Sequence, residues 1–281
     1  MHSGIVLKKQ ADLFSIETDQ GISECVARKN LKKEGIFVGD NVLLDEDGAI
    51  FKVQTRKNIL IRPPVANIDK MFIVIAPVPK ADFYTVDKLL IFCTLNNIKP
   101  ILCINKNDLD SDFCEKTKKT YSKICKTLVF STIDESVKIL KKEIKGICVL
   151  AGQSAVGKSS IINSLVGENV AKTDDFSKKI ERGKQTTRTV QLYKFGKGNF
   201  LADTAGFSKL DESLLDLKED EVKYYFEDFL PYAEMCKYKS CLHTNPKDCG
   251  VIEAVKDGKI DKNRYENYLK LYQTIKSIKK F

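Results

Sequence analysis

Short runs that alternate apolar and polar residues fill the first 60 positions, and turn-forming residues separate them. Such runs are typical of β-strands, and Asp47-Gly48 is typical of a hairpin turn. The expected strands cover residues 4–7, 13–18, 41–44 and 49–53. About five short strands in so short a stretch predict a small barrel, for which the OB-fold is the natural candidate. A generic small barrel with a solvated face is the alternative.

The pattern changes after Arg62-Pro63-Pro64, which we interpret as a linker. Residues 71–76 are all apolar and predict a strand that is buried on both faces. Buried strands and amphipathic helices then alternate, which predicts a mostly parallel sheet with helices on both faces. The expected helices cover residues 84–96, 114–123 and 135–145, and the expected strands cover 101–104, 128–130 and 147–150. Beyond Asp203 the sequence predicts helices, the last of them from about Val251 to Lys280.

Composition and charge narrow the class of protein. The chain has 281 residues, of which 43% are hydrophobic and 30% charged, as in soluble globular proteins. We find no apolar run long enough to span a bilayer and no signal segment at the N-terminus, so we expect a cytoplasmic protein without a membrane partner. The net charge of +9 fits a polyanionic partner such as RNA, or only a solvated basic surface. On the barrel the candidates for nucleic-acid contact are Lys8, Lys9, Arg28, Lys29, Lys32 and Lys33.

A phosphate-binding loop follows the strand that ends at Leu150. The segment Gly152-Gln153-Ser154-Ala155-Val156-Gly157-Lys158-Ser159 has the spacing G-x-x-x-x-G-K-S, and a helical pattern follows it. The glycines let backbone N–H groups face phosphate oxygens, Lys158 supplies a positive charge near the β and γ phosphates, and Ser159 is expected to bind Mg²⁺. This motif predicts binding of a nucleoside triphosphate.

A second motif, Asn105-Lys106-Asn107-Asp108, comes directly after the strand 101–104 and predicts the base. The Asp108 carboxylate can accept hydrogen bonds from guanine N1–H and its exocyclic amine, whereas adenine presents an acceptor at N1. Ser131 and Thr132, at the end of the next strand, are expected to contact the base as well. The residues expected to contact GTP or GDP are Asn105, Lys106, Asp108, Ser131, Thr132, Gly152, Gln153, Ser154, Ala155, Val156, Gly157, Lys158, Ser159 and Ser160.

The hydrolytic residues are expected in two further segments. Asp203, at the end of a strand, begins a D-x-x-G motif and is expected to hold Mg²⁺ through a water. Thr186 and Thr187 lie in a polar loop before it, and one of them is expected to bind Mg²⁺ and the γ-phosphate. Phe207 follows this motif where many GTPases carry a glutamine that orients water, so Gln185 or a partner is the candidate for that role. Slow intrinsic hydrolysis is the expected consequence. The catalytic residues that we predict are Lys158, Gln185, Thr186, Thr187 and Gly206, and the Mg²⁺ ligands are Ser159, Thr186, Thr187 and Asp203.

Three cysteines and a histidine cluster near the C-terminus, at Cys236, Cys241, His243 and Cys249. Three thiols and one imidazole are the ligand set of a closed, tetrahedral structural Zn²⁺ site. Disulfides or coincidental buried cysteines are the alternatives. A closed site predicts that the metal stabilises the fold and has no catalytic role.

The base motif precedes the phosphate loop, whereas in ordinary GTPases it follows, and this reversed order indicates a circular permutation. With the barrel and the cysteine spacing, the chain resembles the RsgA (YjeQ) family of GTPases that depend on the small ribosomal subunit. The resemblance implies an OB-type β-barrel at residues 1–63, a circularly permuted P-loop GTPase domain at 66–215 and a helical zinc-binding domain at 216–281, hence a multidomain α/β fold. It also implies that the chain binds the 30S subunit and 16S rRNA and hydrolyses GTP during late subunit maturation, stimulated by the subunit. We expect the chain to be a monomer.

The chain departs from the family pattern at three places. Family members commonly carry a histidine in place of Gln185, a run of threonines where this chain has Thr186-Thr187-Arg188, and a glycine in place of Ala155. Two other functions are compatible with the motifs. In one, the chain is an rRNA-binding module in which GTP only gates affinity. In the other, it is a permuted GTPase that acts on the large subunit, but that function gives no obvious reason for the barrel and the Cys₃His cluster.

Overall fold

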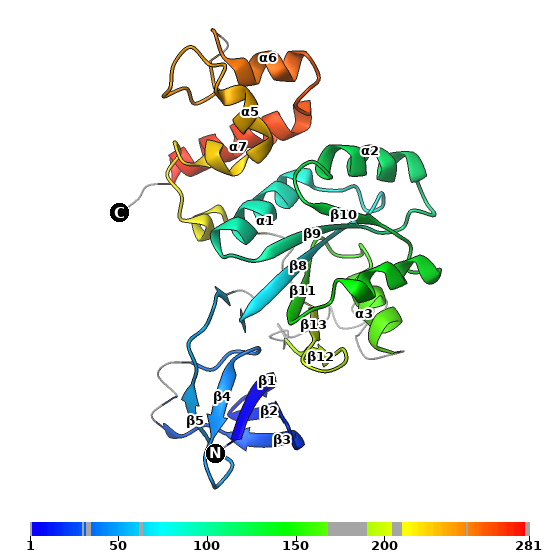
Figure 1. The fold of residues 1–281 in the computed structure, drawn as a ribbon, viewed down its shortest axis with the longest axis vertical. Coiled ribbons are helices and arrows are strands. Elements are labelled where there is room, and N and C mark those ends of the chain that lie inside the picture. Colours follow the sequence, from blue (N-terminus) through cyan, green and yellow to red (C-terminus); the bar gives the residue numbers. More distant parts are fainter. Residues whose placement is uncertain are drawn as a thin grey trace, which may run out of the picture.

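The computed structural model describes residues 2–29, 31, 35–61, 64–167, 190–203, 210–245 and 247–278. Figure 1 shows the barrel strands, the central sheet with its helices and the C-terminal helices one after another along the long axis of the molecule. The multidomain α/β fold expected from the sequence is therefore confirmed, with a strand-rich N-terminal part and a Cys₃His cluster in the C-terminal part.

The N-terminal part is a five-stranded antiparallel sheet with the order β3-β2-β1-β4-β5. Its strands are β1 (His2–Gln10), β2 (Leu13–Thr18), β3 (Gly21–Val26), β4 (Asn41–Leu44) and β5 (Ile50–Val53). A parallel bridge between Ala27 and Ile50 joins the two edges, and the Arg28 N–H donates to the Ile50 carbonyl at 2.9 Å. This bridge curls the sheet into a barrel around a core of its own, which includes Val6, Phe14 and Ile16.

A short antiparallel pair, β6 (Ile59–Leu60) and β7 (Val65–Ala66), leads from the barrel to the central sheet. That sheet has the order β10-β9-β8-β11-β13-β12, in which only β12 is antiparallel to its neighbour. Its strands are β8 (Ile68–Ile75), β9 (Lys99–Ile104), β10 (Lys126–Val129), β11 (Ile147–Ala151), β12 (Leu192–Lys194) and β13 (Phe200–Asp203).

Helices cover both faces of this sheet because its strands are apolar on both sides. Ile73 and Ile75 of β8 belong to the hydrophobic cluster on one face, and Phe72 and Val74 to the cluster on the other. In Figure 1, α1 and α2 lie on one side of the sheet and α3 on the other. The helical elements here are α1 (Phe83–Leu95), α2 (Ser111–Tyr121), the 3₁₀ helix η2 (Glu135–Lys142) and α3 (Lys158–Val166).

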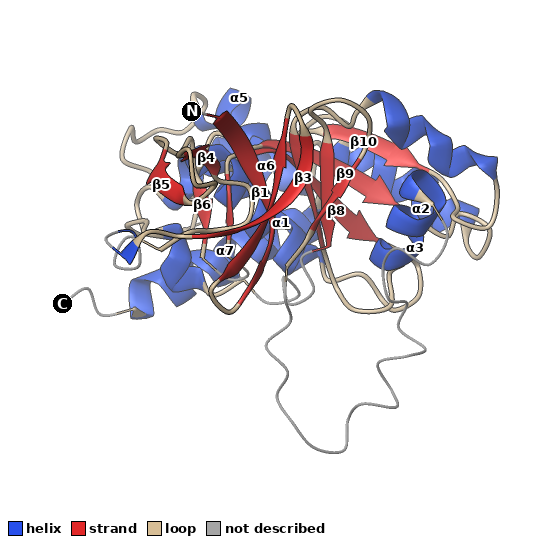
Figure 2. Ribbon diagram, turned by 90° about the horizontal axis from the view of Figure 1, so that it is seen from below, coloured by secondary structure: helices blue, strands red, loops and turns tan. Residues whose placement is uncertain are grey.

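Aspartate side chains fix where helices begin, as N-caps do in general. Asp82 accepts from the Thr85 N–H at 3.1 Å at the start of α1, and Asp110 accepts from the Phe113 N–H at 2.9 Å at the start of α2. In Figure 2, which views the molecule from below, α2 and α3 lie on the side away from β4 and β5 of the barrel, and α2 packs against β9 and β10.

The C-terminal part is helical, as expected. The prediction of one continuous helix from about Val251 to Lys280 is wrong. The chain forms two helices there, and Gly258 between them has φ +70°, a conformation that favours glycine and ends the first helix. The elements are η3 (Glu212–Leu215), η4 (Val222–Tyr225), η5 (Glu227–Phe229), α5 (Leu230–Ala233), α6 (Gly250–Lys256) and α7 (Lys262–Ser277).

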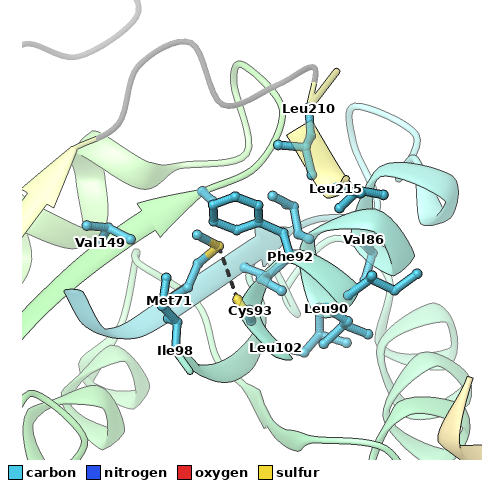
Figure 3. Close-up of a cluster of buried hydrophobic side chains, with 14 of the residues drawn as sticks. Met71, Val86, Leu90, Phe92, Cys93, Ile98, Leu102, Val149, Leu210 and Leu215 are labelled. Carbon is cyan, nitrogen blue, oxygen red and sulfur yellow. Dashed lines mark hydrogen bonds between the residues drawn. The ribbon is translucent and has the colours of Figure 1, made fainter. Parts of the chain in front are cut away.

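The segment after the central sheet packs onto α1. Leu210 and Leu215 lie over this helix near Phe92 and Val86 and share its hydrophobic cluster (Figure 3). Beneath them the Cys93 thiol lies 3.6 Å from the sulfur of Met71 on β8. Helix α1 is therefore packed between the sheet and the C-terminal part of the chain.

Candidate functional site: a nucleotide site and a zinc cluster

The two nucleotide motifs lie at the carboxyl ends of β9 and β11. Both strands pair in parallel with β8, which lies between them. Because the carboxyl ends of parallel strands meet at one edge of a sheet, the two loops face each other across the end of β8. The reversed order in the sequence therefore does not separate the two loops in space.

Two glycines let the phosphate loop take its path. Gly152 has φ +138°, and a Cβ there would lie 2.1 Å from the Val74 carbonyl oxygen. Gly157, the N-cap of α3, has φ +97°, and a Cβ there would lie 2.3 Å from Nδ2 of Asn105. Both positions exclude a side chain by backbone conformation and by space. Val156 is fully buried between them and anchors the loop in the core.

Lys158 folds back over the phosphate loop. Its Nζ donates to the carbonyl oxygens of Gly152 at 3.0 Å and of Gln153 at 2.6 Å. The ammonium group thus lies at the mouth of the loop, where bound phosphates would compete with these carbonyls for it. Ser154 and Ala155 are exposed at the tip, and Ser160 lies in the first turn of α3.

Asn105 connects the loops. Its side chain is fully buried: Nδ2 donates to the Val156 carbonyl at 2.9 Å, and Oδ1 accepts from the Thr132 N–H at 3.2 Å. Lys106 makes a similar bridge, because its Nζ donates to the carbonyls of Ala155 at 2.7 Å and Val78 at 2.8 Å. Hydrogen bonds within the chain therefore hold the base motif, the phosphate loop and the loop after β10 together.

The Asp108 carboxylate is held by the loop after β10. Its Oδ1 accepts a short hydrogen bond from the hydroxyl of Ser131, a residue that is only 2% exposed. The Ser131 N–H in turn donates to the Ser136 hydroxyl at 2.8 Å. Ser136 did not stand out in the sequence. A carboxylate fixed in this way is ready to accept from two donors on one edge of a base.

Ser159 and Asp203 lie side by side. The Ser159 hydroxyl donates to Oδ2 of Asp203 at 2.8 Å, which joins the first turn of α3 to the end of β13. A hydroxyl and a carboxylate are hard oxygen ligands of the kind that Mg²⁺ prefers, so this pair fits the expected magnesium site. The other predicted ligands and catalytic residues (Gln185, Thr186, Thr187 and Gly206), and Phe207, lie outside the described residues.

The cysteine cluster has the dimensions of a tetrahedral metal site. The four ligand atoms of Cys236, Cys241, His243 and Cys249 lie within 4.8 Å of one another. Sγ of Cys236 is 3.9 Å from Sγ of Cys249 and 3.6 Å from Nδ1 of His243. A zinc ion with Zn–S bonds of about 2.3 Å would place its ligands roughly 3.5–3.8 Å apart. All three thiols are free in the structure, which forms no disulfide among them.

The surroundings of His243 favour metal binding through Nδ1. Burial and the positive charge of Lys223 lower the pKa of its imidazole to about 4, so the ring is neutral and can donate a lone pair. The Tyr265 hydroxyl donates to the His243 carbonyl at 2.8 Å, and Lys223 Nζ donates to the Cys241 carbonyl at 3.1 Å. The loop that carries the ligands is therefore held by η4 and α7.

A buried ionic network between α1 and α7 was not foreseen from the sequence. Nε and Nη2 of Arg264 donate to the two carboxylate oxygens of Asp228 at 2.9 and 2.7 Å, and Nη1 donates to Asp87. The Asp87 carboxylate also accepts from Asn267 at 2.7 Å and from the Tyr121 hydroxyl at 3.0 Å. Asp87 and Arg264 are 177 residues apart, and a local pattern gives no signal for such a pair.

Among the described residues, none of the helices combines the length and the apolar character that a membrane span needs.

Comparison with known proteins agrees with this geometry. Residues 53–213 match the model of the family described as RsgA GTPase. The Small ribosomal subunit biogenesis GTPase RsgA of Ruminiclostridium cellulolyticum is 37% identical, over 100% of this chain and 96% of its own length. The crystal structure of YjeQ from Thermotoga maritima superimposes with a TM-score of 0.79 at 31% identity and covers 99% of both chains. The crystal structure of YloQ, a circularly permuted GTPase, superimposes with a TM-score of 0.76 at 28% identity and covers 99% of this chain and 96% of its own. With the permuted order of the motifs, these similarities over the full length show that the chain is a GTP-hydrolysing enzyme and belongs to the RsgA GTPase family.

Proposed function

We propose that this chain binds the small ribosomal (30S) subunit through its 16S rRNA and hydrolyses GTP to GDP and phosphate during late maturation of that subunit, with hydrolysis stimulated by the subunit. The observation that carries the proposal is the geometry of the nucleotide site, in which Asn105 joins the base loop to the phosphate loop and Ser159 contacts Asp203. The name of the curated relatives, a small ribosomal subunit biogenesis GTPase, supports the choice of partner. A ribosomal partner also implies the cytoplasmic location expected from the sequence, and we propose that the chain acts as a monomer.

Each group in the site has a role in this proposal. Asp108, held by Ser131, would read the guanine edge, and Lys158 would neutralise the β and γ phosphates. Ser159 and Asp203 would hold Mg²⁺, which when bound stabilises the negative charge that develops on the transferred phosphoryl group. Thr186 or Thr187 and Gly206 remain the predicted γ-phosphate contacts, and Gln185 or the ribosomal subunit the predicted source of water positioning.

We further propose that the functional units follow the predicted boundaries, with the barrel at 1–63, the GTPase domain at 66–215 and the zinc-binding domain at 216–281. The barrel core supports the first boundary, because it is separate from the two clusters of the central sheet. The zinc ion would hold the loop between α5 and α6, where four ligands occupy 14 residues and leave no open coordination position.

The competing proposal is an rRNA-binding module in which GTP only gates affinity. A module of that kind needs the base loop and the phosphate loop, but it does not need a carboxylate at the end of β13 placed against the phosphate-loop serine. The 2.8 Å contact between Ser159 and Asp203 therefore favours the hydrolytic function.

The test is GTP turnover with and without purified 30S subunits, with 50S subunits as the control for ribosomal RNA in general. We expect slow turnover by the isolated chain and a clear increase with 30S subunits alone. Lys158→Ala, which removes the charge over the phosphate loop, should abolish turnover under both conditions. Equal rates with and without 30S subunits would favour the binding module, and stimulation by 50S subunits would favour a function on the large subunit.

A further inference from the structure

The positive charge of this chain is concentrated in its central part. Residues 64–215 contain 24 Lys and Arg against 17 Asp and Glu, which accounts for +7 of the net charge of +9. The N-terminal and C-terminal parts therefore carry about +1 each, although the barrel was the expected site of nucleic-acid contact. On the barrel, Arg28 pairs with Asp45 at 2.5 Å and approaches Asp47 at 3.6 Å, so its charge is largely compensated.

The topology of the central sheet collects these charges at one edge. Helices that connect parallel strands run back along the sheet, so the C-terminal ends of α2 and η2 lie at the amino-terminal edge, where β9 and β10 begin. Eight exposed lysines occur at these helix ends and strand starts, and we call them the lysine edge. They are Lys99, Lys118, Lys119, Lys123, Lys126, Lys141, Lys142 and Lys145.

Few acidic groups compensate the lysine edge. In the part of the chain that the structure describes, only Lys118 and Lys126 of this set have a carboxylate within 4 Å. Glu143, the partner of Lys126, is shared with Lys70, and the hydrogen bond from Lys126 lowers the pKa of its carboxyl group. Asp112 of α2 and Glu135 of η2 lie in the first turns of these helices, toward the nucleotide edge, and Glu115 of α2 lies one turn before its partner Lys118.

Stabilisation of helix ends explains only part of this set. Cations in the last turn of a helix interact favourably with the helix dipole, which is sufficient reason for lysines in α2 and η2. It does not explain Lys99 and Lys126, which begin strands, or Lys123 and Lys145, which lie in the connections that follow the helices. In contrast, Lys256, Lys259 and Lys262 in the C-terminal part each have an acidic partner within 4 Å.

We propose that the lysine edge is an RNA-binding surface that contacts backbone phosphates of rRNA in the small ribosomal subunit. This inference rests on the function proposed above. Lysines provide point charges that suit phosphate contacts and carry no base specificity. Because the surface lies at the opposite edge of the sheet from the nucleotide loops, rRNA held there leaves the GTP site open.

The experiment compares two variants that lose the same charge. Lys119→Gln, Lys123→Gln and Lys142→Gln together change the lysine edge, and Lys256→Gln, Lys259→Gln and Lys262→Gln together form the matched control. Affinity for 30S subunits and for isolated 16S rRNA is measured from 50 to 200 mM salt, and basal GTP turnover is measured in parallel. For each lost phosphate contact, the slope of log affinity against log salt should fall by roughly 0.7–0.9.

We expect the lysine-edge variant to bind at least about tenfold more weakly, with a slope reduced by about two, while basal turnover and the control variant stay unchanged. An unchanged slope, or an equal loss in the control, would overturn the inference. So would binding of the wild-type chain through these lysines to phosphatidylserine vesicles but not to 16S rRNA. Failure of the wild-type chain to bind or respond to 30S subunits would instead reject the proposed function, and the isolated rRNA would still test the lysine edge.

Discussion

Replacing Arg264 by methionine should loosen the contact between α7 and α1. The side chains of Arg264 and Asp87 are 3% and 2% exposed, and that of Asp228 is 16% exposed. The substitution keeps a long apolar side chain but leaves two carboxylates without their cation in a buried place. Breaking a buried ion pair from one side costs about 3–5 kcal/mol, because the remaining charge is desolvated and uncompensated.

The assay is hydrogen exchange of backbone amides in α7, which reports the free energy of local opening even when the whole chain does not unfold in one step. Lys262→Met on the same helix is the control. Its contact with Glu266 is exposed on both sides (80% and 57%), so we expect a loss of no more than about 0.5 kcal/mol. A loss below about 1 kcal/mol for Arg264→Met would refute the assigned role of the network.

The pH dependence of the stability difference between wild type and Arg264→Met gives a second check on the role of Asp87. Burial raises the pKa of the Asp87 carboxyl group, and the charge of Arg264 opposes that rise, so the pKa should rise further in Arg264→Met. A carboxyl group with a raised pKa in the folded state costs stability at pH values above its unfolded pKa, and the cost vanishes as the pH falls and the group is protonated in both states. The difference between wild type and variant should therefore narrow as the pH is lowered from 7 toward about 5. A difference that widens would show that Asp87 is not the group left unpaired.

Three further predictions concern the nucleotide and zinc sites. Asp108→Asn should weaken GTP binding by about ten- to a hundredfold and improve binding of xanthosine triphosphate, which carries a carbonyl where guanine carries its amine. Titration with fluorescent nucleotides measures both affinities, and an unchanged preference for GTP would contradict the role of Asp108. Gly157→Ala should abolish GTP binding in the same titration, because its Cβ would meet Asn105 at 2.3 Å and φ is +97°, whereas Gly196→Ala, in an open turn with φ +71°, should leave nucleotide binding unchanged. Chelation of the metal should expose three reactive thiols to a thiol reagent and lower the melting temperature. Cys249→Ser should lose the bound zinc, whereas Cys25→Ser, in the barrel core, should keep it; equal zinc content in Cys249→Ser and wild type would contradict the ligand set.

The parts of this fold that could be predicted from the sequence depend on local patterns. The apolar runs of the central strands and the G-x-x-x-x-G-K-S segment each need only neighbouring residues, and the structure places β8, β9 and β11 at the expected positions. Strands β3, β6, β7 and β12 were missed, of which β6 and β7 have only two residues each. Strand β3 has mostly exposed side chains, and β12 has only three residues, so neither has a run of apolar residues to identify it.

The parts that could not be predicted depend on contacts between distant residues. The pairing of Ser131 with Asp108 needs the register of β9 and β10, and the lysine edge needs the direction in which the helices return along the sheet. The prediction of one helix over residues 251–280 was avoidable. Asp257-Gly258 is a turn signal, and Asp261 caps α7 by accepting from the N–H groups of Asn263 and Arg264. The roles of Gln185, Thr186 and Thr187 stay predictions, as does the role of Gly206.

Two adjacent residues of α1 connect the segment after the nucleotide strand β13 to the C-terminal part that carries the Cys₃His cluster. Asp87 binds Arg264 of α7, and Lys88 donates to the Leu210 carbonyl at 2.6 Å and to Glu212 at 2.8 Å. Leu210 comes seven residues after Asp203 in the chain, so α1 holds the exit of the nucleotide strand β13 and α7 at the same time. We therefore expect a displacement at one contact to disturb the other, because a packed helix transmits strain. For this reason we expect faster exchange in Arg264→Met to extend from α7 to residues 210–215, and faster exchange confined to α7 would show that the two contacts of α1 are independent.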